Sequence, residues 1–204
     1  MRFGVSVPLL LAFLPFLRAD DPVTCASVIK LANNNEGVRL HSHDVKYGSG
    51  SGQQSVTAVK NSDDVNSHWQ IFPALNEECN RGEPIKCGQK IRLKHLSTGC
   101  FLHSHHFHAP LTKYHQEVSC FGGESDSDTG DNWKVECDGE EWTEEEAIQL
   151  RHIDTKVYLA VSGQQFGRPI NGQREVAGTE GKTNGGYWKA AEGIYMGASD
   201  KSEH

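Results

Sequence analysis

The chain has 204 residues, with 27 acidic and 20 basic side chains and a formal net charge of −7 at pH 7. This acidic balance argues against a nucleic acid or an anionic membrane surface as the partner. Charged residues make up 23% of the chain and aromatic residues 8%, which is ordinary for a folded protein, and the length suits one large domain or two small ones.

The N-terminal stretch predicts a cleaved secretory signal over residues 1–19. Arg2 precedes an apolar run from Val5 to Leu17, and Ala19 offers a cleavage point. The run is too short for a membrane-spanning helix, which needs about 20 apolar residues. We therefore expect the mature protein, residues 20–204, to be a single soluble domain in the secretory pathway.

The rest of the chain contains three copies of one pattern of leucine, glutamine and tryptophan. An anchor leucine is followed by a second leucine after 9 residues, by a glutamine after 23 and by a tryptophan after 38 to 40. The anchors are Leu31, Leu93 and Leu150, and the tryptophans are Trp69, Trp133 and Trp188. Such self-similarity is typical of repeat architectures. We predict three repeats, at about residues 23–78, 86–138 and 143–194.

Apolar residues alternate with polar ones around these anchors, as in Ile91/Leu93 and Val157/Leu159. This period of two is typical of half-buried strands. Each repeat supplies about four strands: one at the anchor leucine, a central hairpin, and one at the tryptophan. Three such units predict an all-β chain, a β-trefoil in which a closed six-stranded barrel is capped by three hairpins. The repeat tryptophans are predicted to be buried.

The six cysteines favour disulfides, because their number is even and the chain is predicted to be secreted. Cys25 and Cys87 each lie six residues before an anchor leucine. In a trefoil the first and last strands of one repeat are neighbours. This favours Cys25–Cys79 and Cys87–Cys137, each bracketing one repeat, although the sequence alone allows 15 connectivities.

The remaining pair, Cys100 and Cys120, lies on the two arms of the central hairpin of repeat two. The two cysteines are placed to bond to each other. However, the other repeats have valine and alanine at these positions, where a small hydrophobic residue suffices. The sequence leaves both interpretations open. A zinc site made of these cysteines is disfavoured, since no Cys-x-x-Cys pair is present.

Histidines recur in the central hairpins of repeats one and two, which read His41-Ser42-His43 and His103-Ser104-His105-His106. Alternate residues of a strand share a face, so His103 and His105 present two imidazoles together. A metal site would need two further ligands from elsewhere. We interpret the recurrence as a polar hairpin surface inherited by both repeats, with a metal site and a pH-sensitive surface as alternatives.

Catalysis finds little support in the sequence. Ser42 and Ser104 sit between histidines, but a serine nucleophile needs a base placed in space and a third group that orients the base. Neighbours on a strand point to opposite faces, which works against His41 and Ser42 as a dyad. Phosphate-loop, dinucleotide-binding and zinc-protease motifs are absent from the sequence. We predict a protein that is not an enzyme and needs no cofactor.

The two His-Ser-His segments, the stretch from Tyr47 to Val56 (Tyr-Gly-Ser-Gly-Ser-Gly-Gln-Gln-Ser-Val) and Phe166 to Ile170 (Phe-Gly-Arg-Pro-Ile) resemble MIR repeats. These are trefoil modules shared by protein O-mannosyltransferases, inositol trisphosphate receptors and ryanodine receptors. Their spacing is most similar to that of the small stand-alone members, the stromal cell-derived factor 2 family. The resemblance covers residues 23 to about 196 and implies a β-trefoil built from three MIR repeats.

The same resemblance implies a place in the lumen of the endoplasmic reticulum. There the protein would act in folding quality control, beside a J-domain co-chaperone and the lumenal heat-shock ATPase, with unfolded or O-mannosylated clients. Family members usually end in a retention tetrapeptide of the His-Asp-Glu-Leu type. This chain ends at Ser202-Glu203-His204, so secretion is the alternative location. The alternative function is lectin-like carbohydrate binding, although the Gln-x-Trp signature of ricin-type lectins is missing.

An asymmetry among the repeats indicates where a partner binds, because repeat three has Leu159-Ala160-Val161-Ser162 in place of the histidine segment. The glycine-rich loop Gly48–Gly52 lets a partner backbone approach closely, and Arg168 offers a forked donor for a carboxylate. The alternative is drift in a structural repeat. The predicted binding residues are His41, Ser42, His43, Tyr47, His103, Ser104, His105, His106 and Arg168. We expect that replacing His41, His43, His103 and His105 together by alanine leaves thermal unfolding nearly unchanged and weakens partner binding.

Overall fold

The computed structural model describes residues 21–144 and 146–197. Twelve strands and three short 3₁₀ helices make up its regular structure, which confirms the all-β prediction for these residues. The predictions for the signal segment and for the C-terminal residues 202–204 lie outside the described residues. Within the described part of the chain, no helix is long and apolar enough to cross a membrane.

Each predicted repeat contains four strands and one 3₁₀ helix just before its fourth strand. Repeat one contains β1 (Val28–Asn33), β2 (Val38–Lys46), β3 (Gln54–Val59), η1 (Val65–Ser67) and β4 (Trp69–Pro73). Repeat two contains β5 (Lys90–His95), β6 (Phe101–His108), β7 (Gln116–Phe121), η2 (Thr129–Asp131) and β8 (Trp133–Glu136). Repeat three contains β9 (Gln149–His152), β10 (Tyr158–Gln165), β11 (Arg174–Thr179), η3 (Asn184–Gly186) and β12 (Lys189–Ile194).

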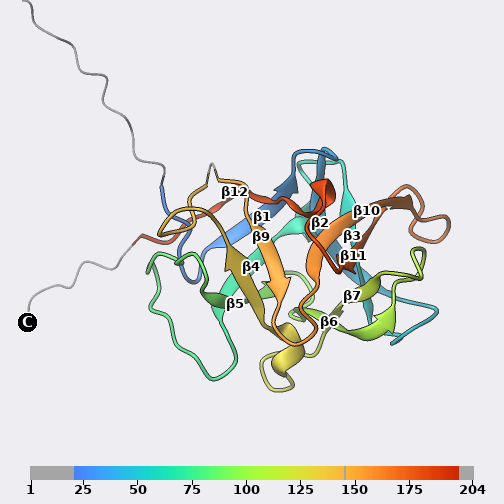
Figure 1. Cartoon of the computed structure of the whole chain (residues 1–204), viewed down its shortest axis with the longest axis horizontal. Helices are drawn as coiled ribbons and strands as arrows, with labels where there is room; N and C mark the ends of the chain where they lie inside the picture. The colour runs from blue at the N-terminus through green and yellow to red at the C-terminus, as the bar shows by residue number, and fades with distance from the viewer. Residues whose placement is uncertain (1–20, 145, 198–204) are drawn as a thin grey trace, which may run out of the picture.

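The first and last strands of the three repeats form a closed ring. Strand β1 pairs with β12 and β4, β4 pairs with β5, β5 with β8, and β8 with β9. A bridge between Ile148, just before β9, and Trp188, just before β12, completes the circle. The hairpins β2–β3, β6–β7 and β10–β11 pair with one another through β3, β7 and β11. In Figure 1 the ring lies mainly on the left and the hairpins on the right.

The core fills the ring, and the strand period decides which side chains enter it. In β5, Ile91, Leu93 and His95 are buried, whereas the alternate residues reach the surface. The repeat tryptophans Trp69, Trp133 and Trp188 are fully buried, as predicted. Their indole N–H groups donate to the carbonyl oxygens of Leu40, Leu102 and Leu159, at 3.0, 2.9 and 2.9 Å. The bond between each repeat tryptophan and the second leucine of its repeat therefore joins the end of the repeat to its own hairpin.

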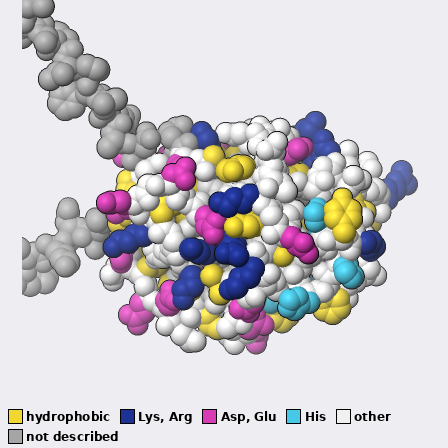
Figure 2. Space-filling model, in the orientation of Figure 1, with side chains coloured by type: hydrophobic (Ala, Val, Ile, Leu, Met, Phe, Trp, Pro, Cys, Tyr) yellow, Lys and Arg dark blue, Asp and Glu magenta, His cyan; other side chains and the backbone are white. Residues whose placement is uncertain are grey.

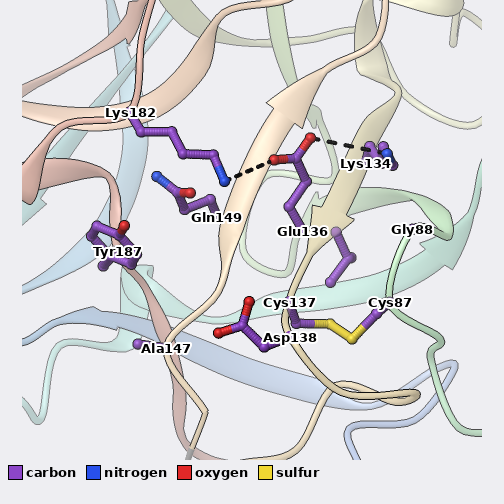
Figure 3. A pocket seen from close by; sticks show the side chains of 11 residues that line it. Cys87, Gly88, Lys134, Glu136, Cys137, Asp138, Ala147, Gln149, Lys182 and Tyr187 are labelled. Atoms are coloured by element: carbon purple, nitrogen blue, oxygen red, sulfur yellow. Dashed lines mark ion pairs between the residues drawn. A yellow bond between two sulfur atoms is a disulfide. The ribbon is translucent and has the colours of Figure 1, made fainter.

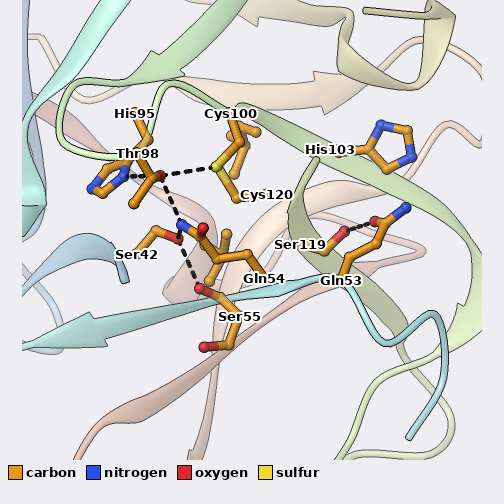
Figure 4. Close-up of a disulfide and its surroundings, with 12 residues drawn as sticks. Ser42, Gln53, Gln54, Ser55, His95, Thr98, Cys100, His103, Ser119 and Cys120 are labelled. Atoms are coloured by element: carbon orange, nitrogen blue, oxygen red, sulfur yellow. Dashed lines mark hydrogen bonds between the residues drawn. A yellow bond between two sulfur atoms is a disulfide. The ribbon is translucent and has the colours of Figure 1, made fainter. Parts of the chain in front are cut away.

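The glutamine of the repeat pattern holds neighbouring repeats together. Gln54 Nε2 donates to Thr98 Oγ1 in repeat two at 2.9 Å, and Thr98 Oγ1 lies 2.8 Å from Nδ1 of the buried His95 (Figure 4). His95 Nε2 is 2.8 Å from the carbonyl oxygen of Asn66 in repeat one. Because a carbonyl only accepts, Nε2 carries the proton, and the Thr98 hydroxyl donates to Nδ1.

The same arrangement joins repeats two and three. Gln116 Nε2 donates to Thr155 Oγ1 at 2.6 Å, Thr155 Oγ1 lies 2.7 Å from His152 Nδ1, and His152 Nε2 lies 2.9 Å from the carbonyl oxygen of Gly130. Repeat one has Asn33 at the equivalent position, and its amide makes a similar bond to repeat three. Both histidines thus act as neutral, buried hydrogen-bonding links.

These two links predict a loss of stability in mild acid. Burial lowers the pKa of His95 and His152 below the ordinary value of 6.5 and outweighs the neighbouring carboxylates Asp64, Asp131 and Asp154. Below pH 6.5 the two histidines therefore bind protons in the unfolded chain, whereas in the folded chain they stay neutral down to a lower pH. The stabilising contribution is complete above pH 6.5 and falls as the pH drops below that value.

We expect the free energy of unfolding in urea to be lower at pH 5.5 than at pH 7.5. Replacing His95 and His152 by asparagine, the residue that repeat one uses, should flatten this dependence. Replacing the exposed His106 by asparagine is the control and should leave the dependence as it is. An unchanged slope in the double variant would contradict the assignment of the acid effect to these two residues.

The structure contains three disulfides, and no cysteine of the described residues is free. The predicted bridges are confirmed: the Cα atoms of Cys25 and Cys79 are 6.1 Å apart, and those of Cys87 and Cys137 are 5.2 Å apart. Pairing of β1 with β4 and of β5 with β8 brings the ends of each repeat together. The open question on the third pair is settled, since Cys100 and Cys120 are bonded across the β6–β7 hairpin (Figure 4).

Candidate binding site on the second hairpin

The paired strands of all three hairpins change register, between Ser42 and Lys46, Ser104 and His108, and Val161 and Gln165. Such a bulge bends the strand and re-aims the side chains beyond it. The predicted residues therefore divide by burial. His41, Ser42, Tyr47, His103 and Ser104 are buried, His43 and His105 are half-buried, and His106 and Arg168 are exposed.

In repeat one the two histidines are bonded to each other. His41 Nδ1 lies 2.8 Å from Asp64 Oδ2, and His41 Nε2 lies 2.8 Å from His43 Nδ1. The same Asp64 oxygen accepts a bond from the Ser67 hydroxyl at 2.6 Å. Partial burial, and then the nearby imidazole of His41, lower the pKa of His43. This chain of bonds fixes the rings against the η1 turn.

In repeat two the equivalent histidine bonds to the η2 turn. His103 Nδ1 is 2.9 Å from Oδ1 of the fully buried Asp131 and 3.6 Å from Asp128. The other oxygen of Asp131 accepts bonds from the Ser127 hydroxyl at 2.6 Å and the Asp128 amide at 3.2 Å. His103, Asp128 and Asp131 bring one potential ligand atom each within 4.8 Å of one another. Oδ2 of Asp131 is therefore hydrogen-bonded within the turn, and Oδ1 is bonded to His103 of β6.

The second histidine of repeat two has a different partner from its counterpart in repeat one. His105 Nε2 lies 3.0 Å from Oε1 of the fully buried Glu117. Glu117 also accepts bonds from the backbone and side chain of Ser51, in the glycine-rich loop of repeat one. A Cβ at Gly50, which has a φ of +66°, would overlap the Glu117 carboxylate. Glycine at position 50 therefore leaves room for the Glu117 carboxylate to bond to the glycine-rich loop.

Repeat three has the same kind of contact, between a buried carboxylate and the hairpin loop of the preceding repeat. Glu175 is fully buried and accepts bonds from the amide and hydroxyl of Thr112 in the loop of repeat two, and from the Ser162 hydroxyl. Repeat one has Ser55 at the position of Glu117 and Glu175, and the hydroxyl of this buried serine has no hydrogen-bond partner. Buried carboxylates therefore bond to the first two hairpin loops. The third hairpin loop carries Arg168, and the equivalent residue for it, Ser55, has no carboxylate.

A hollow of about 300 Å³ opens at the second hairpin. Its walls come from β6, the η2 turn and the β9–β10 loop, namely His103, Ser104, His105, His106, Asp128, Thr129, Gly130, Asp154 and Thr155. Within it, the Thr129 hydroxyl donates to Asp154 Oδ2 at 2.7 Å. The lining is polar and presents imidazole, hydroxyl and carboxylate groups. It suits a ligand that both donates and accepts hydrogen bonds.

The structure divides the predicted binding residues between different places. The hollow gathers residues of the second hairpin and repeat three, and neither the first-hairpin histidines nor Arg168 line it. His41 and His103 are buried and bonded to carboxylates, so we expect the fourfold histidine replacement to lower the unfolding temperature rather than leave it unchanged. Tyr47 faces inward too: its hydroxyl lies 2.9 Å from the Val56 carbonyl, and burial raises its pKa.

Sequence reasoning missed the acidic half of this site, although a signal for it was present. Counting back five residues from the repeat tryptophans gives Asp64, Asp128 and Thr183. The two repeats with a histidine in the hairpin have aspartate here, whereas repeat three pairs Ala160 with Thr183. Residues that vary together in this way across internal repeats are candidates for contact.

A family model of the MIR domain matches residues 33–138, just over half of the chain, so this is a MIR-domain protein. Human stromal cell-derived factor 2 is 54% identical over 178 residues, which cover 87% of this chain and 84% of the human protein. The chain belongs to the stromal cell-derived factor 2 family.

Solved structures agree with this assignment. A Caenorhabditis elegans protein of unknown function is 72% identical, with a TM-score of 0.84 over 85% of this chain and 98% of that one. The SDF2-like protein from Arabidopsis thaliana is 42% identical, with a TM-score of 0.85 over 88% of this chain and all of that one. The S. cerevisiae Pmt1–Pmt2 protein O-mannosyltransferase complex, bound to its sugar donor, is 26% identical with a TM-score of 0.77, over 90% of this chain but only 28% of that one.

Proposed function

We propose that this chain is a non-catalytic interaction module of the endoplasmic reticulum lumen. In this role it acts in protein folding quality control with a J-domain co-chaperone and the lumenal heat-shock ATPase. The observation that carries the proposal is membership of the stromal cell-derived factor 2 family, at 54% identity over 87% of the chain. The three disulfides support an oxidising compartment, with secretion as the alternative location.

We assign the fold as a β-trefoil of three MIR repeats, and the ring of six strands with its three paired hairpins supports this assignment. A closed ring leaves few free strand edges, so the barrel is a rigid base for its loops. Recognition usually takes place on loops that such a scaffold positions. We place the partner site at the hollow of the second hairpin, where His106 and Asp154 are exposed.

Affinity purification of the tagged protein from the secretory pathway, with mass spectrometry of its partners, tests this proposal. The variant His106→Ala/Asp154→Ala removes two exposed side chains from the hollow and should unfold at nearly the wild-type temperature. We expect recovery of the J-domain partner to fall at least tenfold. The control His108→Ala/Asp126→Ala changes the same residue types at exposed positions outside the hollow and should retain the partner. Full recovery with the first variant would refute this site, and absence of any J-domain protein from the wild-type sample would refute the function.

Lectin-like binding of a mannosylated client is the second candidate. It is favoured by the polar lining of the hollow and by the similarity to the sugar-donor-bound O-mannosyltransferase complex. Sugar sites typically include an aromatic plate, however, and histidine supplies the only rings among the residues that line this hollow. Titration with mannose and an O-mannosylated peptide decides between the candidates, since sugar binding that His106→Ala/Asp154→Ala abolishes would favour the lectin.

A further inference from the structure

A row of cations crosses three neighbouring strands of the ring, away from the hairpin site. Lys90 of β5 lies opposite Lys134 of β8, and Lys134 lies opposite Arg151 of β9. Like charges at directly opposite positions destabilise a sheet. Figure 2 shows Lys and Arg side chains gathered in the middle of this face, over β5, β8 and β9. In a chain with a net charge of −7, this concentration of positive charge needs a reason.

The acidic groups that face this row are fewer than the cations. Three cations surround the Glu136 carboxylate. Lys182 Nζ lies 3.3 Å from a carboxylate oxygen, and Lys134 Nζ and Arg151 Nη1 of the row each lie 4.0 Å from one. The Glu136 side chain is 19% exposed, so it lies among the cations rather than outside them. Lys90 has a separate partner in Glu77. The centre of the patch therefore keeps an excess of positive charge around one carboxylate.

A second hollow, of about 420 Å³, adjoins the patch (Figure 3). Lys134, Lys182 and Glu136 line it together with Gln149, Tyr187 and the Cys87–Cys137 disulfide. Gln149 is only 3% exposed, yet its Nε2 has no hydrogen-bond acceptor. A buried donor without an acceptor is costly, and such a group in a native protein calls for an explanation. Figure 3 shows the Gln149 amide between Lys182 and Tyr187.

We propose that this second hollow binds an acidic peptide segment. The ammonium groups of Lys134 and Lys182 bind the carboxylates of the segment, and the Gln149 amide donates to one of them. Glu136 and Asp138, which also line the hollow, accept bonds from peptide N–H groups, and Tyr187 provides an apolar contact. These two carboxylates need hydrogen-bond donors, which the backbone N–H groups of a peptide supply. A peptide is therefore the ligand that matches both signs of charge.

The proposal is independent of the J-domain partner, because the two hollows share no lining residue. The probes are fluorescein-labelled hexaglutamate and hexaglutamine, titrated with the full chain and followed by fluorescence polarisation. We expect hexaglutamate to bind at least tenfold more tightly than hexaglutamine and to weaken as salt is added, since screening acts on exposed charge pairs.

Two double variants with equal net charge separate the site from overall charge. Lys134→Glu/Lys182→Glu reverses the cations of the hollow and should weaken hexaglutamate binding at least tenfold. The control Lys46→Glu/Lys113→Glu reverses two exposed lysines outside it and should bind within twofold of the wild type. Gln149→Leu, of similar size, should weaken binding severalfold without lowering the unfolding temperature.

Equal binding of the two peptides, equal losses in the two double variants, or no binding at all would overturn the proposal. Tighter binding of a heparin-derived sulfated tetrasaccharide that depends on Lys134 and Lys182 would also overturn it in favour of an anionic glycan. The variant His106→Ala/Asp154→Ala should bind hexaglutamate normally. Failure of this site and failure of the proposed function are thus observed separately.

Discussion

Replacing Trp133 by alanine is expected to lower the free energy of unfolding by about 3–5 kcal/mol, the usual range for a large core aromatic. Its side chain is fully buried, and its indole N–H donates to the Leu102 carbonyl at 2.9 Å. The His152 ring packs on it with centroids 4.9 Å apart. The substitution leaves a cavity inside a closed ring, where neighbouring strands are paired on both sides and cannot easily collapse. It also leaves a buried carbonyl without its donor.

Equilibrium unfolding in guanidinium chloride measures this loss, and Trp133→Phe is the matched control. Phenylalanine keeps most of the buried ring but lacks the N–H group, so the difference between the two variants reports the cavity apart from the hydrogen bond. We expect Trp133→Phe to be clearly the milder change. Because Trp69 and Trp188 make the same bond in their own repeats, alanine there should have a similar effect. A loss below about 1 kcal/mol would mean that the residue does not act as a core residue.

The repeat pattern predicted most of the fold because its leucines and tryptophans have the same structural task in every copy. Anchor leucines and tryptophans occupy inward positions of strands, so their spacing reflects strand length and hairpin length directly. Gln54 and Gln116 proved to be links between repeats, which their spacing alone did not show, whereas the strand register places Arg174 rather than Gln173 at their position in repeat three. A partner in another repeat, such as Thr98 for Gln54, is determined by ring closure and lies beyond the reach of local periodicity.

The binding site was harder to predict because polar residues on a strand can point either way. His95 lies two residues after Leu93, on the buried face of β5, so alternation was a signal that this histidine belongs to the core. His41 and His103 are buried, and their imidazoles are bonded to Asp64 and Asp131 at the η1 and η2 turns. These carboxylates are 23 and 28 residues away in sequence. Burial of each imidazole thus depends on a turn that strand alternation does not reveal and that only a comparison between the repeats indicates.

Removing the Cys25–Cys79 bridge is expected to destabilise the protein more than removing Cys100–Cys120. The first closes a loop with a sequence separation of 54, the second one of 20. Chain entropy in the unfolded state gives about 4 kcal/mol for the longer loop and about 3 kcal/mol for the shorter one. The Cys25–Cys79 loop contains no other bridge, so its full length counts, whereas Cys100–Cys120 lies inside the loop closed by Cys87–Cys137.

The repeats themselves provide the matched substitution for the shorter bridge. Repeat one has Val38 and Ala58 where repeat two has Cys100 and Cys120, so Cys100→Val/Cys120→Ala introduces residues that the same hairpin accepts in repeat one. Packing is then largely preserved, and the measured loss reports the cross-link. Guanidinium unfolding of this variant and of Cys25→Ala/Cys79→Ala, with mass spectrometry to verify the remaining bridges, gives the two values. A larger loss for the hairpin variant would show that local packing at β6–β7, rather than loop closure, determines what the bridge contributes.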